Sequence, residues 1–300
     1  MYYEEDRTQA DIAREIGYSR PTVSRMLTLA REMRIVKVSI SHPLERILAV
    51  EKRLLDALPL TAIRVSEPDG GDPIESIGAA AAELLVETIK NGQVLAVGNG
   101  RSVAAAARHV PATPREDCTV VQILGSMTGG LPEWGRDSPT ITTHIAQQFG
   151  ATAARMSVPL IMDDPDLLRA LMREERIATT LALASRADIA LVGVAGVQSY
   201  GAGNILADYL TPSINRAIRE SGAVGHILDR HFDAHGNEVH TPLTDRTFSL
   251  PLSALTTIPT VMAVAAGDEK AEAILTAIQG GIVDALVTDY PTAKALLHRL

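Results

Sequence analysis

The sequence is poor in several features that mark large classes of protein. Its 300 residues include one cysteine, Cys118, which excludes an intramolecular disulfide framework and fits a reducing compartment. No segment approaches about 18 uninterrupted apolar residues, so we expect no membrane span. Only 3% of the residues are aromatic although 46% are hydrophobic, so the core must be mainly aliphatic. These absences favour a cytoplasmic protein with a sizeable core of Ala, Val, Leu and Ile.

Signatures of common catalytic sites are missing as well. The chain has no G-x-S-x-G elbow, no P-loop and no H-E-x-x-H pair. Four histidines, His226, His231, His235 and His240, lie close together in the sequence, but no cysteine accompanies them. A strand followed by a turn explains that segment better than a metal site. We therefore expect no metal, no cofactor and no catalytic residue.

What is present is a helix-turn-helix pattern over residues 8–40. Ile12 and Ile16 give the first predicted helix an apolar stripe. Gly17 ends that helix because glycine takes a positive φ without a Cβ clash, and Ser19 is placed to cap the next helix. The expected buried face of the second helix consists of Val23, Met26, Leu27 and Ala30. Val36, Val38 and Ile40 alternate with polar residues, as in the wing strand of a winged helix.

The charge of this segment differs from that of the whole chain. Residues 19–40 contain five Lys or Arg and one acid, whereas the net charge of the chain is −8. A local basic surface on an acidic protein suits contact with DNA phosphates at one end only. The alternative is an ordinary helical hairpin with a solvated polar face. The predicted DNA-contacting residues are Thr8, Gln9, Ser19, Arg20, Pro21, Thr22, Ser24 and Arg25.

The domain organisation follows from the change of pattern after residue 42. Residues 1–42 form the predicted DNA-binding domain, and residues 43–58 a linker or oligomerisation helix with a strongly apolar side. That helix packs either on its own domain or on a partner subunit. Residues 59–300 alternate between strands and helices, which predicts βαβ units and a mostly parallel sheet.

Three loops that follow predicted strands are candidate ligand sites, because ligands bind at the carboxyl ends of strands in open α/β sheets. The loop 98–102 joins two glycines to a helix N-terminus with Arg101 and Ser102, which suits an anion. The loop 125–130 is also glycine-rich. In the third loop, Lys270 falls in the first turn of the helix predicted over 268–279, where a cation is unfavourable unless an anion is nearby. Elsewhere, we expect a strand over Thr247–Leu250. Asp233 lies in a predicted turn, where it could accept hydrogen bonds from sugar hydroxyls.

Taken together, these segments resemble the SorC family of sugar-responsive bacterial transcriptional regulators. The resemblance is carried by YYEEDRTQADIAREIGYSRPTVSRML, VGNGRS, GAVGHILDRHFDAHG and PTVMAVAAGDEKAEAILTAIQGG, in this order. It implies a winged helix-turn-helix joined to a Rossmann-like α/β effector domain related to sugar-phosphate isomerases and deaminases. It also implies a homo-tetramer or dimer that binds operator DNA under the control of a phosphorylated sugar or polyol.

Matched by motif, the resemblance implies an effector site. Its members are Gly98, Gly100, Arg101, Ser102, Thr128, Gly129, Gly130, Asp233 and Lys270. The chain departs from the family pattern at Asn99, where the family often has Trp, and in the Ala-Ala-Gly turn before Lys270, where Ala-Gly-Gly is usual. The chain also begins at YYEE, where the family has another turn or more of helix, so we expect either a late start or a shortened first helix.

These observations predict a regulator of a carbohydrate or polyol catabolic operon whose operator binding responds to a phosphorylated sugar. The alternative is a sugar-phosphate isomerase- or deaminase-like enzyme with an appended helical module. A positioned acid–base pair would favour the enzyme, and the sequence offers none beyond Asp233 and Lys270.

Overall fold

The computed structural model describes residues 7–33, 43–67, 71–127, 137–199 and 209–300. The chain divides into two compact units, residues 1–46 and 47–300, and each is described here by itself. The predicted wing strand at 36–40 and the predicted site residues Thr128, Gly129 and Gly130 lie outside the described residues.

The small unit contains the two helices expected from the helix-turn-helix pattern, α1 (Gln9–Ile16) and α2 (Arg20–Glu32). The Thr8 side chain caps α1 by accepting a hydrogen bond from the Asp11 N–H, and Gly17 ends the helix with φ 73°. The Ser19 hydroxyl accepts a hydrogen bond from the Thr22 N–H at 3.3 Å, as expected of a residue that caps α2.

The core of the small unit is narrower than the pattern predicts. Ile12, Ala13 and Val23 are buried, and Leu27 packs against them. Met26 was expected on the buried face but is 46% exposed. Two short helices that cross share only a narrow seam, so the apolar stripe of α2 is wider than the surface that α1 can cover.

Helix α3 (Pro43–Ala57) has two apolar sides. Val50, Leu54 and the following Leu58 join the main core of the large unit, whereas Leu48 and Leu55 are exposed. The boundary between the two compact units falls inside this helix, four residues after the boundary expected at 42. The inner side of α3 therefore packs on its own domain, and the outer side is free for another contact.

The large unit is organised around a seven-stranded sheet in which every pairing is parallel, as predicted, with the order β1-β10-β9-β5-β2-β3-β4. The strands are β1 (Ala62–Ser66), β2 (Val94–Val97), β3 (Thr119–Gln122), β4 (Thr152–Ala154), β5 (Ile189–Val192), β9 (Thr260–Val264) and β10 (Ala285–Asp289). Nearly all residues of the inner strands β5, β9 and β10 are buried, because helices cover both faces of the sheet.

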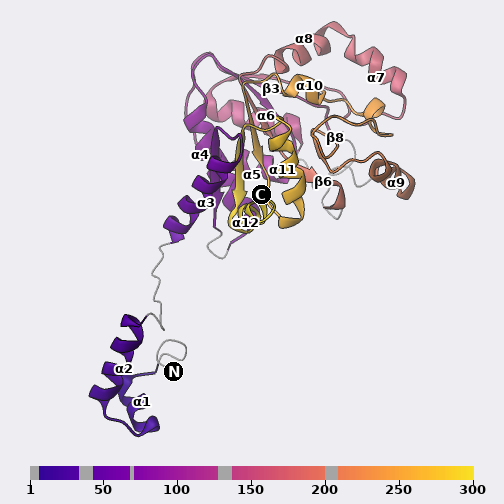
Figure 1. The fold of residues 1–300 in the computed structure, drawn as a ribbon. Coiled ribbons are helices and arrows are strands. Elements are labelled where there is room, and N and C mark those ends of the chain that lie inside the picture. Colours follow the sequence, from indigo (N-terminus) through magenta and orange to yellow (C-terminus); the bar gives the residue numbers. More distant parts are fainter. Residues whose placement is uncertain (1–6, 34–42, 68–70, 128–136, 200–208) are drawn as a thin grey trace. The chain divides into compact units, whose positions relative to one another are not determined.

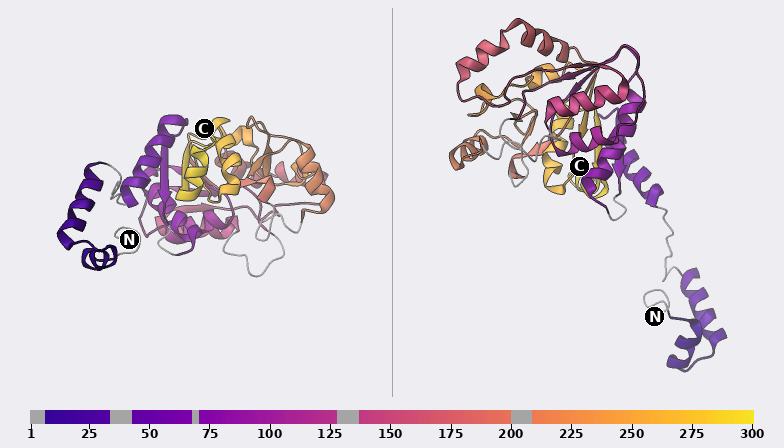
Figure 2. Two further views of the ribbon diagram at one scale, coloured as in Figure 1. Left: turned by 60° about the horizontal axis from the view of Figure 1, so that its bottom comes forward. Right: turned by 180° about the vertical axis from the view of Figure 1, so that it is seen from behind.

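The helices form a layer on each face. One layer holds α4 (Pro73–Thr88), α5 (Arg101–His109) and α6 (Ser138–Phe149), and the other holds α3, α8 (Glu175–Ala184), α11 (Ala271–Gln279) and α12 (Tyr290–Leu297). Figure 1 has α11 and α12 in front, and the rear view in Figure 2 brings the purple and magenta helices forward. The remaining described α-helices are α7 (Pro165–Met172), α9 (Pro212–Glu220) and α10 (Leu252–Leu255). Within the described ranges, no helix is long and apolar enough to cross a membrane.

A small antiparallel sheet adjoins the large one. It consists of β6 (Ala195–Gly196), β7 (Gly225–Ile227) and β8 (Arg230–Phe232), and β7 and β8 form a tight hairpin. The strand predicted over Thr247–Leu250 is not a regular strand, because this segment makes only isolated bridges, one to Ile161 and one to Leu124. The carbonyl oxygens of Thr247 and Ser249 accept hydrogen bonds from the side chain of Arg230.

The crossing of α4 and α5 requires glycine at position 78. A Cβ atom on Gly78 would lie 2.7 Å from the carbonyl carbon of Ala105. We expect Gly78→Ala to lower the free energy of unfolding by about 1–3 kcal/mol, because overpacking outweighs the better helix propensity of alanine. Denaturant unfolding measures this, with Gly71→Ala as the control because a Cβ there meets no atom within 4 Å. Equal stabilities of the two variants would contradict the close packing.

Candidate site at the carboxyl end of the sheet

The strand order reverses between β2 and β5, which is the position where open α/β sheets form a ligand crevice. Gly98 directly follows β2, and its N–H donates to the carbonyl of Leu191 in β5 at 2.9 Å. A Cβ on Gly98 would lie 3.3 Å from that carbonyl oxygen and 3.2 Å from Leu228 Cδ2. Close packing at the switch point therefore favours glycine as the first residue of the loop.

The rest of this loop opens helix α5. Gly100 has φ 107°, and α5 begins at Arg101 without a side-chain cap. The N–H groups of the first turn of a helix have no partner within the helix, and together with the helix dipole they favour an anion. Arg101 is exposed at this helix start and Ser102 is partly buried.

Lys270 reaches the same region from the end of β9. It is the last residue of a short 3₁₀ turn, Asp268–Lys270, and the N-cap of α11, which begins three residues later than the helix start predicted at 268. Burial lowers the pKa of Lys270, the charge of Arg101 acts in the same direction, and Glu269 and Asp289 oppose the shift. Arg101 and Lys270 therefore lie close enough to repel each other, and an anion between them would relieve that repulsion.

The tip of the β7–β8 hairpin covers this crevice. Its two turn residues, Leu228 and Asp229, both have positive φ, at 52° and 59°. Such a conformation in non-glycine residues costs on the order of 1–3 kcal/mol each and persists only where surrounding structure imposes it.

Arg230 holds the hairpin in place. Its guanidinium is buried and donates to the hydroxyl of Ser249 and to the carbonyl oxygens of Thr244, Thr247 and Ser249 at 2.9–3.1 Å. Burial lowers the pKa of Arg230, with the carboxylates of Glu238 and Asp229 opposing that shift. These hydrogen bonds link the start of β8 to the segment 244–249. They therefore stabilise the position of the Leu228–Asp229 turn, which directly precedes β8.

Asp229 and His226 form a buried titratable pair at the hairpin tip. Asp229 is 4% exposed, and its Oδ1 lies 3.5 Å from His226 Nδ1. Burial raises the pKa of Asp229 to about 7, although Arg230 and Asn99 favour the charged form. Burial, with His231 and Lys270, lowers the pKa of His226 to about 3, so the imidazole is neutral at physiological pH. The charge of Lys270 is one of the causes that lower the His226 pKa, so Lys270 lies within electrostatic range of His226.

The exposed face of α2 carries the predicted DNA-contacting side chains. Arg20, Ser24 and Arg25 are exposed, whereas the Thr22 hydroxyl is hydrogen-bonded to that of Ser19 at 2.8 Å. Thr8 serves α1 as its cap, as described above. The cationic members of the predicted set are thus available to a ligand, whereas the hydroxyls of Thr8, Ser19 and Thr22 make hydrogen bonds within the local fold.

Comparison with known proteins gives the family. Residues 42–298 match the family model of a sugar-binding domain. The chain is 32% identical over 306 residues to the transcriptional regulator LsrR of Escherichia coli K12, covering 99% of this chain and 92% of the relative. The chain belongs to the SorC family of transcriptional regulators. It is also 28% identical to the sorbitol operon regulator of Klebsiella pneumoniae, whose full-length crystal structure superposes with a TM-score of 0.80 over 99% of this chain and 95% of that one.

Within this SorC-family fold, Asp233 is not brought to Lys270. The Asp233 carboxylate accepts hydrogen bonds from the N–H groups of His235 and Asn237 at 2.8 and 2.9 Å, and these bonds lower its pKa against the effect of burial. A Cβ on Gly236 in the same turn would lie 2.8 Å from the Cα of Gly280, just beyond the end of α11. Lys270 precedes the start of that helix, so a contact of Asp233 with the effector stays a prediction.

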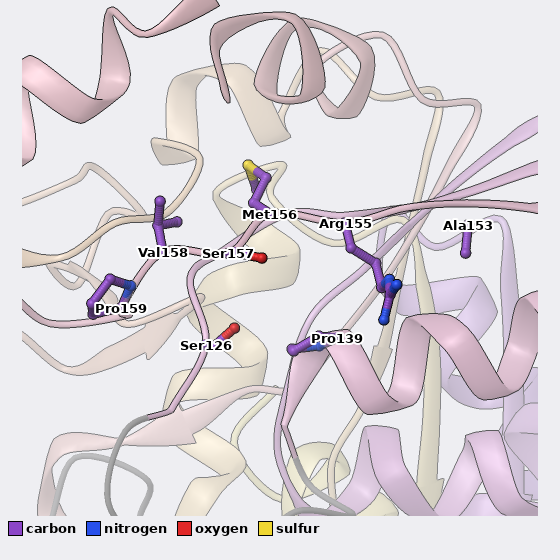
Figure 3. Close-up of a pocket in the computed structure, with 8 residues that line it drawn as sticks. All are labelled: Ser126, Pro139, Ala153, Arg155, Met156, Ser157, Val158 and Pro159. Carbon is purple, nitrogen blue, oxygen red and sulfur yellow. The ribbon is translucent and has the colours of Figure 1, made fainter. Parts of the chain in front are cut away.

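The second glycine-rich loop has a structural reason for its first glycine. A Cβ on Gly125 would lie 2.4 Å from the carbonyl oxygen of Pro159. Beside it is a pocket of about 610 Å³ lined in part by Ser126 and Arg155, and Figure 3 shows the Arg155 side chain reaching toward Pro139 at the start of α6.

Among the described residues, no group of three or more potential metal ligands is present, and His226 and His231 are buried neighbours with ring centroids 5.4 Å apart.

The residue that sequence patterns missed is Asp229. It was read as part of a strand-and-turn segment, and no spacing rule places it beside Gly98. The one local signal is that Leu228-Asp229 separates two short apolar stretches by two residues, as in a hairpin, although neither residue is the glycine that such turns favour.

Asp229 makes the stability of the chain depend on pH. Its folded-state pKa of about 7 lies above its ordinary value of 3.8, so its ionisation destabilises the folded state progressively as pH rises from about 4 to about 7. We expect Asp229→Asn, which cannot ionise, to melt on the order of 5 °C above the wild type at about pH 8 and at nearly the same temperature at about pH 4. Thermal unfolding of both proteins at each pH measures this. A constant difference across the pH range would show that Asp229 does not titrate in this way.

Proposed function

We propose that this SorC-family chain binds operator DNA of a carbohydrate or polyol catabolic operon and that a phosphorylated sugar or polyol controls this binding. The observation that carries the proposal is that two cations, Arg101 and Lys270, lie within electrostatic range of each other beside an uncapped helix N-terminus at the switch point. A dianionic phosphate would satisfy the helix N-terminus and both cations together.

The helix α2 is proposed to enter the major groove. It begins at a capped turn and exposes Arg20 and Arg25, which suit phosphates or the edges of guanine. A pair of such units related by twofold symmetry would read a roughly palindromic site.

Removing the two arginines of α2 should weaken operator binding. We expect the double variant Arg20→Ala/Arg25→Ala to bind a DNA fragment from upstream of its operon at least about tenfold more weakly, with the slope of log affinity against log salt reduced by about two. Gel shift or fluorescence anisotropy over a salt series measures both. Arg173→Ala, an exposed arginine next to α7, is the matched control. If the double variant bound the DNA with wild-type affinity, the prediction that α2 contacts the operator would be wrong.

Removing either cation of the crevice should abolish effector binding. A ligand that binds only the native state raises its melting temperature. We expect sugar and polyol phosphates to stabilise the wild type and to lose at least about tenfold in affinity with Arg101→Ala or Lys270→Met. Thermal-shift titration measures this, with Arg108→Ala at the other end of α5 as the control. Unchanged shifts in both variants would place the phosphate elsewhere.

Control of DNA binding requires that the effector favour one of two states with different operator affinities. We propose that these states belong to a homo-dimer or tetramer, which the apolar outer side of α3 supports. Since the relatives are regulators of transcription, we assign the chain to the compartment of the chromosome, the cytoplasm, and expect no turnover of the sugar phosphate.

A further inference from the structure

Two buried polar atoms close to the switch point have no hydrogen-bond partner among the described residues. They are Nδ2 of Asn99, from the loop after β2, and Oδ2 of Asp229, from the hairpin tip. The two side chains are neighbours: Asn99 is close enough to Asp229 to favour the charged carboxyl as a hydrogen-bond donor, but the two groups do not have the geometry of a formed hydrogen bond. Leu228 packs on Gly98 and so brings the hairpin tip onto the loop. Buried polar groups in native proteins are generally paired, so an unpaired donor and an unpaired acceptor that lie together at a switch point are a candidate contact for a ligand.

The chemistry of the two atoms limits what the ligand can present. Asn99 Nδ2 is a donor, and Oδ2 of an ionised carboxyl is an acceptor. A hydroxyl group satisfies both, since its oxygen accepts from the amide while its proton is donated to the carboxylate. A phosphate satisfies only the amide, because the carboxylate would repel it. The phosphate therefore belongs with Arg101 and Lys270, and a hydroxyl belongs with Asn99 and Asp229.

We propose that Asn99 and Asp229 together bind one hydroxyl group of the phosphorylated sugar or polyol and thereby determine which one acts as effector. This inference rests on the proposed function and specifies the polar end of the same site.

The other side chains of the hairpin hold Asp229 for this role. His226 Nδ1 lies 3.5 Å from Oδ1, so the imidazole faces one carboxyl oxygen and Oδ2 is the atom left for a ligand. Arg230 anchors the adjoining strand through its four hydrogen bonds. His226 and Arg230 are thus positioning residues, and Asn99 and Asp229 are the contacting ones.

The test is a calorimetric titration of the full chain with inorganic phosphate and with pentose, hexose and polyol phosphates, each beside its monodeoxy analogues. The variants are Asn99→Ala and Asp229→Gly, and glycine is chosen because it accepts the positive φ of 59° without strain. We expect the wild type to prefer one hydroxylated compound over its deoxy analogue by roughly 10- to 100-fold. Both variants should reduce that preference to less than about threefold and leave the affinity for inorganic phosphate undiminished.

The outcomes separate this inference from the proposed function. Variants that keep the wild-type preference, or that lose inorganic phosphate and every sugar phosphate alike, overturn the hydroxyl contact and leave the two residues a structural role. A wild type that binds phosphate but discriminates between no pair also overturns it while the phosphate site stands. A wild type that binds neither phosphate nor any sugar phosphate overturns the proposed effector class and this inference together.

Discussion

The site depends on one contact, the packing of the β7–β8 hairpin tip on the glycine loop after β2. Gly98 is small enough to let Leu228 approach, and the hydrogen bonds of Arg230 keep the hairpin from withdrawing. The same contact lies beside the turn in which Leu228 and Asp229 have positive φ. The strained turn at Leu228–Asp229 and the buried guanidinium of Arg230 therefore act together to hold the Asp229 carboxyl near the loop after β2.

The electrostatics of the crevice are graded across a short distance. Arg101 and Lys270 supply positive charge beside a helix N-terminus, His226 is neutral, and Asp229 titrates near neutrality. A ligand with a phosphate at one end and hydroxyl groups at the other matches this gradient. Helix α2, which we propose reads DNA, shares none of these residues, so control of DNA binding by the ligand requires a change of conformation or assembly that the ligand favours.

Local signals in the sequence were sufficient where a short segment determines its own conformation. Gly17 and Ser19 predicted the turn of the helix-turn-helix, and the alternation of apolar strands with helices predicted the parallel sheet. They failed where the answer depended on a distant partner. Met26 fits the apolar spacing of α2 but is not covered by the described residues. Thr247–Leu250 has strand-like residues, but the carbonyl groups of Thr247 and Ser249 accept hydrogen bonds from Arg230.

The sequence by itself determined the family, the order of the elements and the loop 98–102, because the residues that carry them are contiguous and their signals are local. Only the tertiary structure decided which distant residues meet there. Lys270 follows that loop by more than half of the chain and reaches it because β9 and β2 flank β5 in the sheet. Asp229 lies near this loop because Leu228, its neighbour in the hairpin turn, packs on Gly98. Asp233 lies in the next turn, which packs on Gly280 beyond the end of α11.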